Sequence, residues 1–269
     1  MIRAGILLSI AVAAAASGQE AGGYSAGPAD EPTYRTIVQS YRESPPPTQD
    51  RLFAGTRFWR LDPGRYEVET WWESEVPKDG SGTTHTLQAE IEIGLTPHIQ
   101  LDLYEVLQVL PDQTLTHEGN RIELRYSIAR EYGAIWANPT IYLEWHPRHN
   151  APDRAEMRLL LGGQIAGPFI GAANIYYEQN VQTSGPEGTD AEVGTQLAAS
   201  YPVSPWMRLG GELKLGMDQH GTPKFSTVAL AGPNAILKLG RFKLTATLFF
   251  GLAPDDPRID PFLIAGYAF

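Results

Sequence analysis

The chain has 269 residues, of which 42% are hydrophobic and 10% aromatic, and it contains no cysteine. The lack of cysteine excludes disulfides, thiolate metal sites and a cysteine nucleophile. The 31 acidic and 21 basic residues give a formal net charge of -10, which excludes the basic surface typical of a nucleic-acid-binding protein.

The N-terminus has the three parts of a secretory signal peptide. Arg3 supplies a positive charge, residues 6–16 form an apolar run, and Ser17-Gly18 are small residues suited to cleavage. The apolar run is shorter than the ~20 residues that a membrane-spanning helix needs. We therefore expect residues 1–18 to direct export and to be removed. No cysteine follows that would carry a lipid anchor.

Residues 19–62 are predicted to be irregular. Gly22-Gly23, Gly27-Pro28 and Pro45-Pro46-Pro47 interrupt every periodic pattern in this part of the chain. Two interpretations stay open for this segment: a periplasmic lead-in, or a plug inside the lumen of the domain that follows.

From residue 63 to residue 269 the dominant pattern is strict alternation of apolar and polar residues. In residues 86–95, for example, Leu87, Ile91 and Leu95 fall on one face and Glu90 on the other. This period of two predicts strands, because a helix would repeat its apolar residues every three or four positions. Twelve such runs occur, at about 64–76, 83–95, 98–109, 119–132, 138–146, 154–165, 168–183, 189–201, 204–219, 223–238, 242–253 and 260–269.

The length of these runs predicts an all-β, transmembrane, antiparallel up-and-down barrel of about twelve strands over residues 63–269. Most runs exceed the five or six residues typical of strands in soluble proteins, and they match the ~9–11 residues of membrane-spanning strands. Short links such as Thr96-Pro97 alternate loosely with long ones such as residues 147–153, as in outer-membrane barrels. A soluble β-sandwich is the alternative, but it explains neither the long strands nor the terminal aromatic residue Phe269.

The polar faces of the runs are expected to point into the lumen. The candidate lumen-lining residues are Glu67, Glu69, Glu90, Glu92, Asp102, Tyr104, Glu123, Arg125, Tyr142, Glu144, Arg158 and Tyr176. One interpretation is a cation-preferring pore, because a charged wall sets the field in a narrow channel. The other is a lumen closed by ion pairs between strands.

Tyr104, Tyr142 and Tyr176 are the candidates for stacking against an aromatic solute inside the lumen. Aromatic residues at run ends are instead expected to form girdles at the membrane interfaces. This set comprises Trp71, Trp72, Tyr132, Trp136, Trp145, Tyr201, Trp206, Phe249 and Phe250.

No catalytic residue, cofactor or metal ligand is assigned from the sequence. A divalent cation site at Glu67, Glu69, Glu90 and Glu92 would require the first two strands to place these side chains together. Neither a Gly-x-Ser-x-Gly elbow nor a His-Glu-x-x-His motif occurs, which argues against a hydrolase.

Three segments are similar to the Gram-negative outer-membrane barrels of the "MetA-pathway of phenol degradation" family. They are residues 61–69 (Leu-Asp-Pro-Gly-Arg-Tyr-Glu-Val-Glu), Gly232-Pro233-Asn234 and the Gly-Tyr-Ala-Phe terminus. The resemblance implies an outer-membrane barrel that passes hydrophobic or aromatic compounds. The terminal strand ending in Phe269 likewise resembles the signal by which the barrel-assembly machinery recognises such barrels.

The sequence therefore predicts an outer-membrane channel or transporter for passive passage of small solutes. Its expected partners are outer-membrane lipids, the barrel-assembly machinery and a small solute. Two alternatives remain, a lipid-modifying enzyme of the outer membrane and a closed structural barrel.

Overall fold

A computed structural model describes residues 51–149, 151–181, 190–219 and 224–269. The predicted signal peptide and most of the predicted irregular segment lie outside these ranges. Within them, the chain forms twelve antiparallel strands and no helix long and apolar enough to cross a membrane. The strands are β1 Tyr66–Glu75, β2 Thr84–Gly94, β3 Ile99–Val109, β4 Leu115–Ser127, β5 Thr140–His146, β6 Arg154–Ala166, β7 Phe169–Asn180, β8 Ala191–Ser204, β9 Met207–Gln219, β10 Phe225–Leu239, β11 Phe242–Gly251 and β12 Ile259–Ala268.

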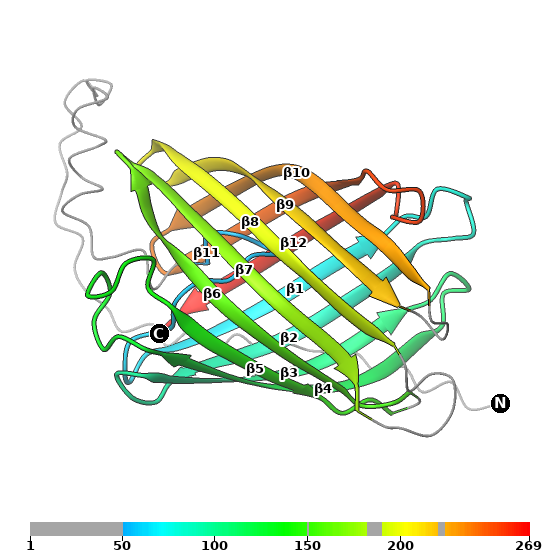
Figure 1. Ribbon diagram of the computed structural model, residues 1–269, viewed down its shortest axis with the longest axis horizontal. Helices are drawn as coiled ribbons and strands as arrows, with labels where there is room; N and C mark the ends of the chain where they lie inside the picture. Colours follow the sequence, from blue (N-terminus) through cyan, green and yellow to red (C-terminus); the bar gives the residue numbers. More distant parts are fainter. Residues whose placement is uncertain (1–50, 150, 182–189, 220–223) are drawn as a thin grey trace, which may run out of the picture. The chain divides into compact units, whose positions relative to one another are not determined.

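Each strand pairs with its neighbours in sequence, and β12 returns to β1, so the sheet closes (Figure 1). Glu67 lies opposite Ala268 and Glu73 opposite Phe262 along this closing seam. The N–H of Phe269 donates a hydrogen bond of 3.0 Å to the carbonyl of Tyr66. The twelve-stranded closed barrel predicted from the alternation is confirmed, and closure removes the unpaired edges that an open sheet would expose.

The outward face of the wall is apolar and exposed, whereas the inward face is polar and buried. On β2, for example, Leu87 and Ile91 are exposed, whereas Gln88, Glu90 and Glu92 are buried. The same inversion of the usual soluble pattern recurs on the other strands. Exposed outward residues include Leu103, Ile122, Leu143, Leu159, Ile175, Leu197, Leu209 and Leu248.

The connection between β4 and β5 differs from the sequence prediction. The fourth run was expected to extend to residue 132, but β4 ends at Ser127 and residues 128–139 form an irregular loop. Ala137 and Asn138 in this loop have φ values of 58° and 46°. Non-glycine residues rarely adopt this left-handed region, so the backbone turns here, and β5 begins at Thr140 rather than at residue 138, where the fifth run was predicted to start.

Candidate functional site

Residues 51–62, here called the inner segment, lie within the barrel and contact strands on opposite sides of the lumen. Arg51 reaches β2, Ala54 reaches β9, and Arg57 reaches β7. The segment has no regular secondary structure. Its only acidic residue is Asp62, at its end, whereas it carries three arginines, so it brings positive charge into a lumen lined with carboxylates.

The carboxylates come together because the strand register places them directly opposite one another. Glu69 faces Glu90 across β1 and β2, and Glu92 faces Asp102 across β2 and β3. Asp102 in turn faces Glu123 on β4. We call Glu69, Glu90, Glu92, Asp102 and Glu123 the lumen cluster. Like charges that lie directly opposite in a sheet destabilise it unless a counter-charge is present.

Arg51 supplies one counter-charge from the inner segment. Its Nε lies 2.6 Å from Glu69 Oε2, and its Nη2 lies 3.1 Å from both Glu90 Oε2 and Glu92 Oε1. One guanidinium therefore joins three carboxylates from two strands. All four side chains are buried, which strengthens these contacts relative to a surface ion pair.

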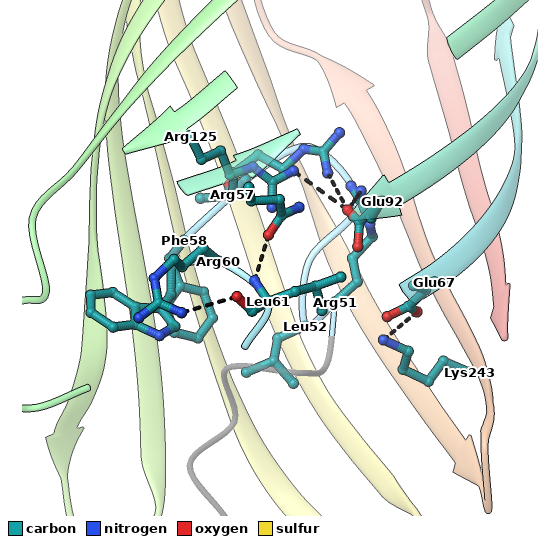
Figure 2. A pocket seen from close by; sticks show the side chains of 13 residues that line it. Arg51, Leu52, Arg57, Phe58, Arg60, Leu61, Glu67, Glu92, Arg125 and Lys243 are labelled. Carbon is teal, nitrogen blue, oxygen red and sulfur yellow. Dashed lines mark hydrogen bonds and ion pairs between the residues drawn. The ribbon is translucent and has the colours of Figure 1, made fainter. Parts of the chain in front are cut away.

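Arg57 and Arg125 supply two further counter-charges, one from the inner segment and one from the wall. Arg57 Nη1 lies 3.7 Å from Glu92 Oε1, and its Nη2 donates a hydrogen bond of 3.0 Å to Tyr104 Oη. Arg125, on β4, lies 2.5 Å from Glu123 and 3.1 Å from Asp102. Figure 2 shows Arg57 and Arg125 both turned toward Glu92. The five carboxylates of the lumen cluster are thus paired with three guanidinium groups, two of which come from the inner segment.

The ring of Trp71 contacts two arginines of the inner segment, Arg51 and Arg57. The guanidinium carbons of Arg51 and Arg57 are 4.4 and 4.6 Å from its ring centroid, within the range of cation–π attraction. Its indole N–H donates to Glu69 Oε2 at 2.9 Å. The expectation that Trp71 belongs to an interfacial girdle is wrong, because the strand phase turns Trp71 inward and Trp72 outward.

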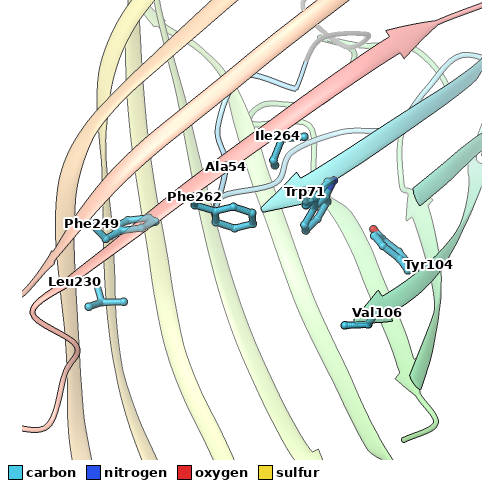
Figure 3. Close-up of a cluster of buried hydrophobic side chains, with 8 residues drawn as sticks. All are labelled: Ala54, Trp71, Tyr104, Val106, Leu230, Phe249, Phe262 and Ile264. Atoms are coloured by element: carbon cyan, nitrogen blue, oxygen red, sulfur yellow. The ribbon is translucent and has the colours of Figure 1, made fainter. Parts of the chain in front are cut away.

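Phe249 is the second girdle residue that the structure corrects. It packs in a buried apolar cluster on the lumen side with Ala54, Trp71, Tyr104, Val106, Leu230, Phe262 and Ile264 (Figure 3). Phe250 is exposed on the outward face. When two aromatic residues are adjacent in a strand, only one can face outward, and composition alone does not tell which one.

The apex of the inner segment is held by one carboxylate. Glu212, on β9, accepts hydrogen bonds from three successive backbone N–H groups, those of Ala54, Gly55 and Thr56, at 2.8, 3.0 and 2.8 Å. Thr247 Oγ1 also donates to Glu212. This carboxylate therefore binds the backbone of the segment rather than a side chain.

Further polar contacts anchor the rest of the inner segment. The amide of Asn174 accepts from the Arg57 N–H at 2.8 Å and donates to the Arg57 carbonyl at 2.5 Å. Gln100 accepts from the Leu61 N–H at 2.5 Å, and Arg60 Nε donates to Ser127 Oγ at 2.8 Å. The inner segment is therefore linked by hydrogen bonds or ion pairs to seven strands, β1, β2, β3, β4, β7, β9 and, through Thr245 and the Arg51 carbonyl, β11.

Arg57 and Arg60 of the inner segment differ in their electrostatic surroundings. Burial lowers the pKa of Arg57, but its interactions with Tyr104 and with the carboxylates of Glu123 and Glu90 outweigh burial, so that its pKa lies well above the ordinary value. Arg60 has fewer opposing charges, and burial lowers its pKa. The surroundings of Arg57 therefore favour its charged form more than those of Arg60 do.

All twelve candidate lumen residues lie on the inward face of the wall, but in two groups. The six nearest the inner segment are the lumen cluster with Arg125, and Tyr104 and Glu67 adjoin them, with Glu67 paired to Lys243 (Figure 2). Tyr142, Glu144, Arg158 and Tyr176 form a second group on β5 to β7. There the Arg158 guanidinium lies 5.0 and 5.7 Å from the rings of Tyr142 and Tyr176.

The carboxylates of the first group approach closely enough to chelate a cation, but arginine side chains occupy that position. Oxygens of Glu67, Glu69 and Glu92 lie within 4.8 Å of one another, as do those of Glu90, Glu92 and Asp102. Arg51 already bridges Glu69, Glu90 and Glu92. With the inner segment in place, this arrangement holds a guanidinium rather than a metal.

The arginines of the inner segment were not predicted from the sequence to be functional residues. Arg51, Arg57 and Arg60 occur in a stretch, residues 51–61, that contains no acid. The contrast between this basic stretch and the acidic faces of the first four strands could have indicated that the two pair.

Comparison with known proteins supports the fold but no family. No protein-family model and no curated protein matches the chain. An outer membrane channel from Pseudomonas putida F1 is similar in structure, with a TM-score of 0.54 and 12% identity over 78% of this chain and 97% of that one. The NanC porin has a TM-score of 0.49 and 10% identity over 76% and 98%. At such identity the likeness establishes a shared barrel fold and no more.

Proposed function

We propose that the chain is a bacterial outer-membrane channel for passive passage of small solutes, and that the inner segment closes its lumen. The observation that carries this proposal is the insertion of Arg51 and Arg57 among the carboxylates of the lumen cluster. A structural barrel needs only a filled interior. Here the filling is a separate stretch of chain, linked to the wall by polar contacts and by apolar packing of Leu52 and Phe53.

The outer-membrane location rests on the surface of the wall. Its outward residues are apolar and exposed, and strands of 10 to 15 residues, apart from β5, are long enough to cross the hydrocarbon layer. A closed barrel satisfies its backbone hydrogen bonds within the wall, as a spanning sheet must. The predicted signal peptide and the terminal strand ending in Phe269 agree with export and with assembly by the barrel-assembly machinery.

Release of the inner segment would open the lumen and expose a mixed wall. The carboxylates of the lumen cluster would face Arg125 alone, which favours cations. On the other side, Ile170, Ala172 and Ala198 would become accessible to apolar groups, since they now pack on Leu52 and Phe53. The resemblance to the MetA-pathway barrels favours hydrophobic or aromatic solutes, for which Tyr142 and Tyr176 provide rings inside the lumen.

Single-channel recording of the chain without residues 1–18 in a planar bilayer tests this proposal. We expect brief discrete steps, because the bound segment keeps the channel closed most of the time. Reversal potentials in a salt gradient should show cation preference. Folding is checked by heat-dependent migration in a detergent gel. A folded chain that never conducts, even under applied voltage, would contradict the channel and favour a closed structural barrel.

A further inference from the structure

The wall residues that receive Arg51 form a complete site for a guanidinium group. Arg51 Nε lies 2.6 Å from Glu69, and its Nη2 lies 3.1 Å from both Glu90 and Glu92. The ring of Trp71 lies beside the same group, with its centroid 4.4 Å from the guanidinium carbon. All four partners belong to β1 and β2, and all four are buried. We call Glu69, Glu90, Glu92 and Trp71 the guanidinium site.

The wall positions the guanidinium site without help from the inner segment. Glu69 and Glu90 are directly opposite each other in the β1–β2 ladder, and Glu92 lies two residues further along β2 on the same face. The indole N–H of Trp71 donates to Glu69 Oε2 at 2.9 Å. Because the strand register fixes these positions, the site stays in the wall when the inner segment leaves.

The guanidinium site leaves one carboxylate oxygen without a hydrogen-bond donor. Glu90 Oε1 is buried and accepts no hydrogen bond even with Arg51 in place, and Arg57 Nη1 lies 4.0 Å from it. Without Arg51 and Arg57, the carboxylates of the lumen cluster have Arg125 as their one guanidinium partner. Like charges at opposite positions of a sheet then repel one another. A cation that takes the place of Arg51 therefore stabilises the released state of the inner segment.

The ring of Trp71 determines which kind of cation fits this site. The guanidinium carbons of Arg51 and Arg57 both lie within cation–π range of the ring, at 4.4 and 4.6 Å from its centroid. A guanidinium group is planar and weakly hydrated, so it binds an aromatic face while its N–H fork donates to carboxylates. An ammonium group is a compact, strongly hydrated charge, and small metal ions lose their water reluctantly. The site therefore matches a guanidinium group better than either of these cations.

We propose that the guanidinium site binds a guanidinium-bearing solute in place of Arg51, and that this exchange releases the inner segment and opens the channel. The proposal rests on the proposed channel function and specifies a class of solute, small organic cations with a guanidinium group. Arg51 and the solute cannot occupy the same carboxylates, so the solute binds only the released state. At ten times its dissociation constant, it raises the ratio of released to bound segment by about 10-fold.

The experiment compares methylguanidinium chloride with methylammonium chloride on the purified chain. Both cations carry one charge and one methyl group, but only the first has the planar fork. Hydrogen exchange of peptides that cover residues 51–62 measures release in detergent, and single-channel recording measures open probability. Trp71→Leu removes the ring and keeps the three carboxylates. Trp72→Leu is the matched control, because Trp72 is the next residue of β1 and points outward.

We expect methylguanidinium to accelerate exchange of the inner segment and to raise the open probability by about 10-fold at saturating concentration, and methylammonium to change neither. Trp71→Leu should remove the difference between the two cations, whereas Trp72→Leu should keep it. A variant with Arg51→Gln and Arg57→Gln tests the site without any change to Trp71. There methylguanidinium should interrupt the sodium current by occupying the vacated carboxylates, and methylammonium should not.

Exchange of residues 51–62 that responds equally to both cations, or to neither, would overturn the guanidinium site, whether or not the chain conducts. Free passage of sodium through the double variant in the presence of methylguanidinium would also overturn it. Selective acceleration of exchange in a folded chain that never conducts would have the opposite meaning. The site would then stand, and the proposed channel would be contradicted.

Discussion

Replacing Arg51 and Arg57 together by glutamine is expected to change a mostly closed channel into a mostly open one. While the segment of this variant is bound, the five carboxylates of the lumen cluster have Arg125 as their one guanidinium partner. Removing one partner of a buried ion pair costs about 3–5 kcal/mol, because the remaining charge stays desolvated. Release relieves that cost, since water then enters the lumen.

A free-energy change of about 3 kcal/mol shifts the ratio of released to bound segment by roughly 100-fold. Single-channel recording should therefore show a correspondingly higher open probability and stronger cation selectivity. Arg65→Gln is the matched control, because Arg65 is an exposed arginine just outside the inner segment. An open probability equal to that of the native chain in the double variant would show that these ion pairs do not hold the segment.

Glu212→Gln is expected to loosen the apex of the inner segment. A glutamine keeps the shape of the side chain, but it offers only one acceptor oxygen. Gly55 and Thr56 both donate to Oε2, which the glutamine carbonyl can replace, so the Ala54 N–H, which donates to Oε1, loses its acceptor. The loss of one hydrogen bond to a charged acceptor costs about 1.5–3 kcal/mol. Amide exchange at these three positions should accelerate by roughly 10-fold or more.

Hydrogen exchange read by mass spectrometry on peptides that cover residues 51–62 measures this effect. Glu192→Gln is the control, because Glu192 pairs with Lys214 and Tyr176 and not with the segment. Unchanged protection of residues 54–56 in Glu212→Gln would mean that the side-chain contacts of Arg51 and Arg57 suffice. The apex would then be held from its flanks.

The fold was predictable because alternation is a local property. Every second residue of a strand faces the same side, so residues such as Ile91 and Glu92 indicate two faces without any knowledge of their neighbours. The length of the runs then distinguishes a spanning barrel from a soluble sandwich. The fifth run, predicted over residues 138–146, is close to β5. The end of β4 was less accessible, because Ile128 continues the alternation beyond Ser127, where the strand ends.

The lumen contacts were less predictable because they join residues far apart in sequence. Arg51 meets Glu90 across 39 positions, and Glu212 meets Thr56 across 156. The segment that carries Arg51 and Arg57 has no period, so its sequence gives charge but no direction. The direction of Trp71, by contrast, follows from local sequence. Alternation along β1 places it on the inward face, but it was assigned by the general tendency of aromatic residues to form interfacial girdles.

Tethering the inner segment to the wall tests most directly whether it closes the channel. The β-carbon of Phe58 and an added β-carbon at Gly162 lie close enough for Phe58→Cys and Gly162→Cys to form a disulfide after a small adjustment. We expect the oxidised variant to show no conductance steps, and dithiothreitol to restore openings in the same bilayer. Each single-cysteine variant should conduct under both conditions. Steps of native size and frequency in the oxidised, tethered chain would contradict closure of the lumen by residues 51–62.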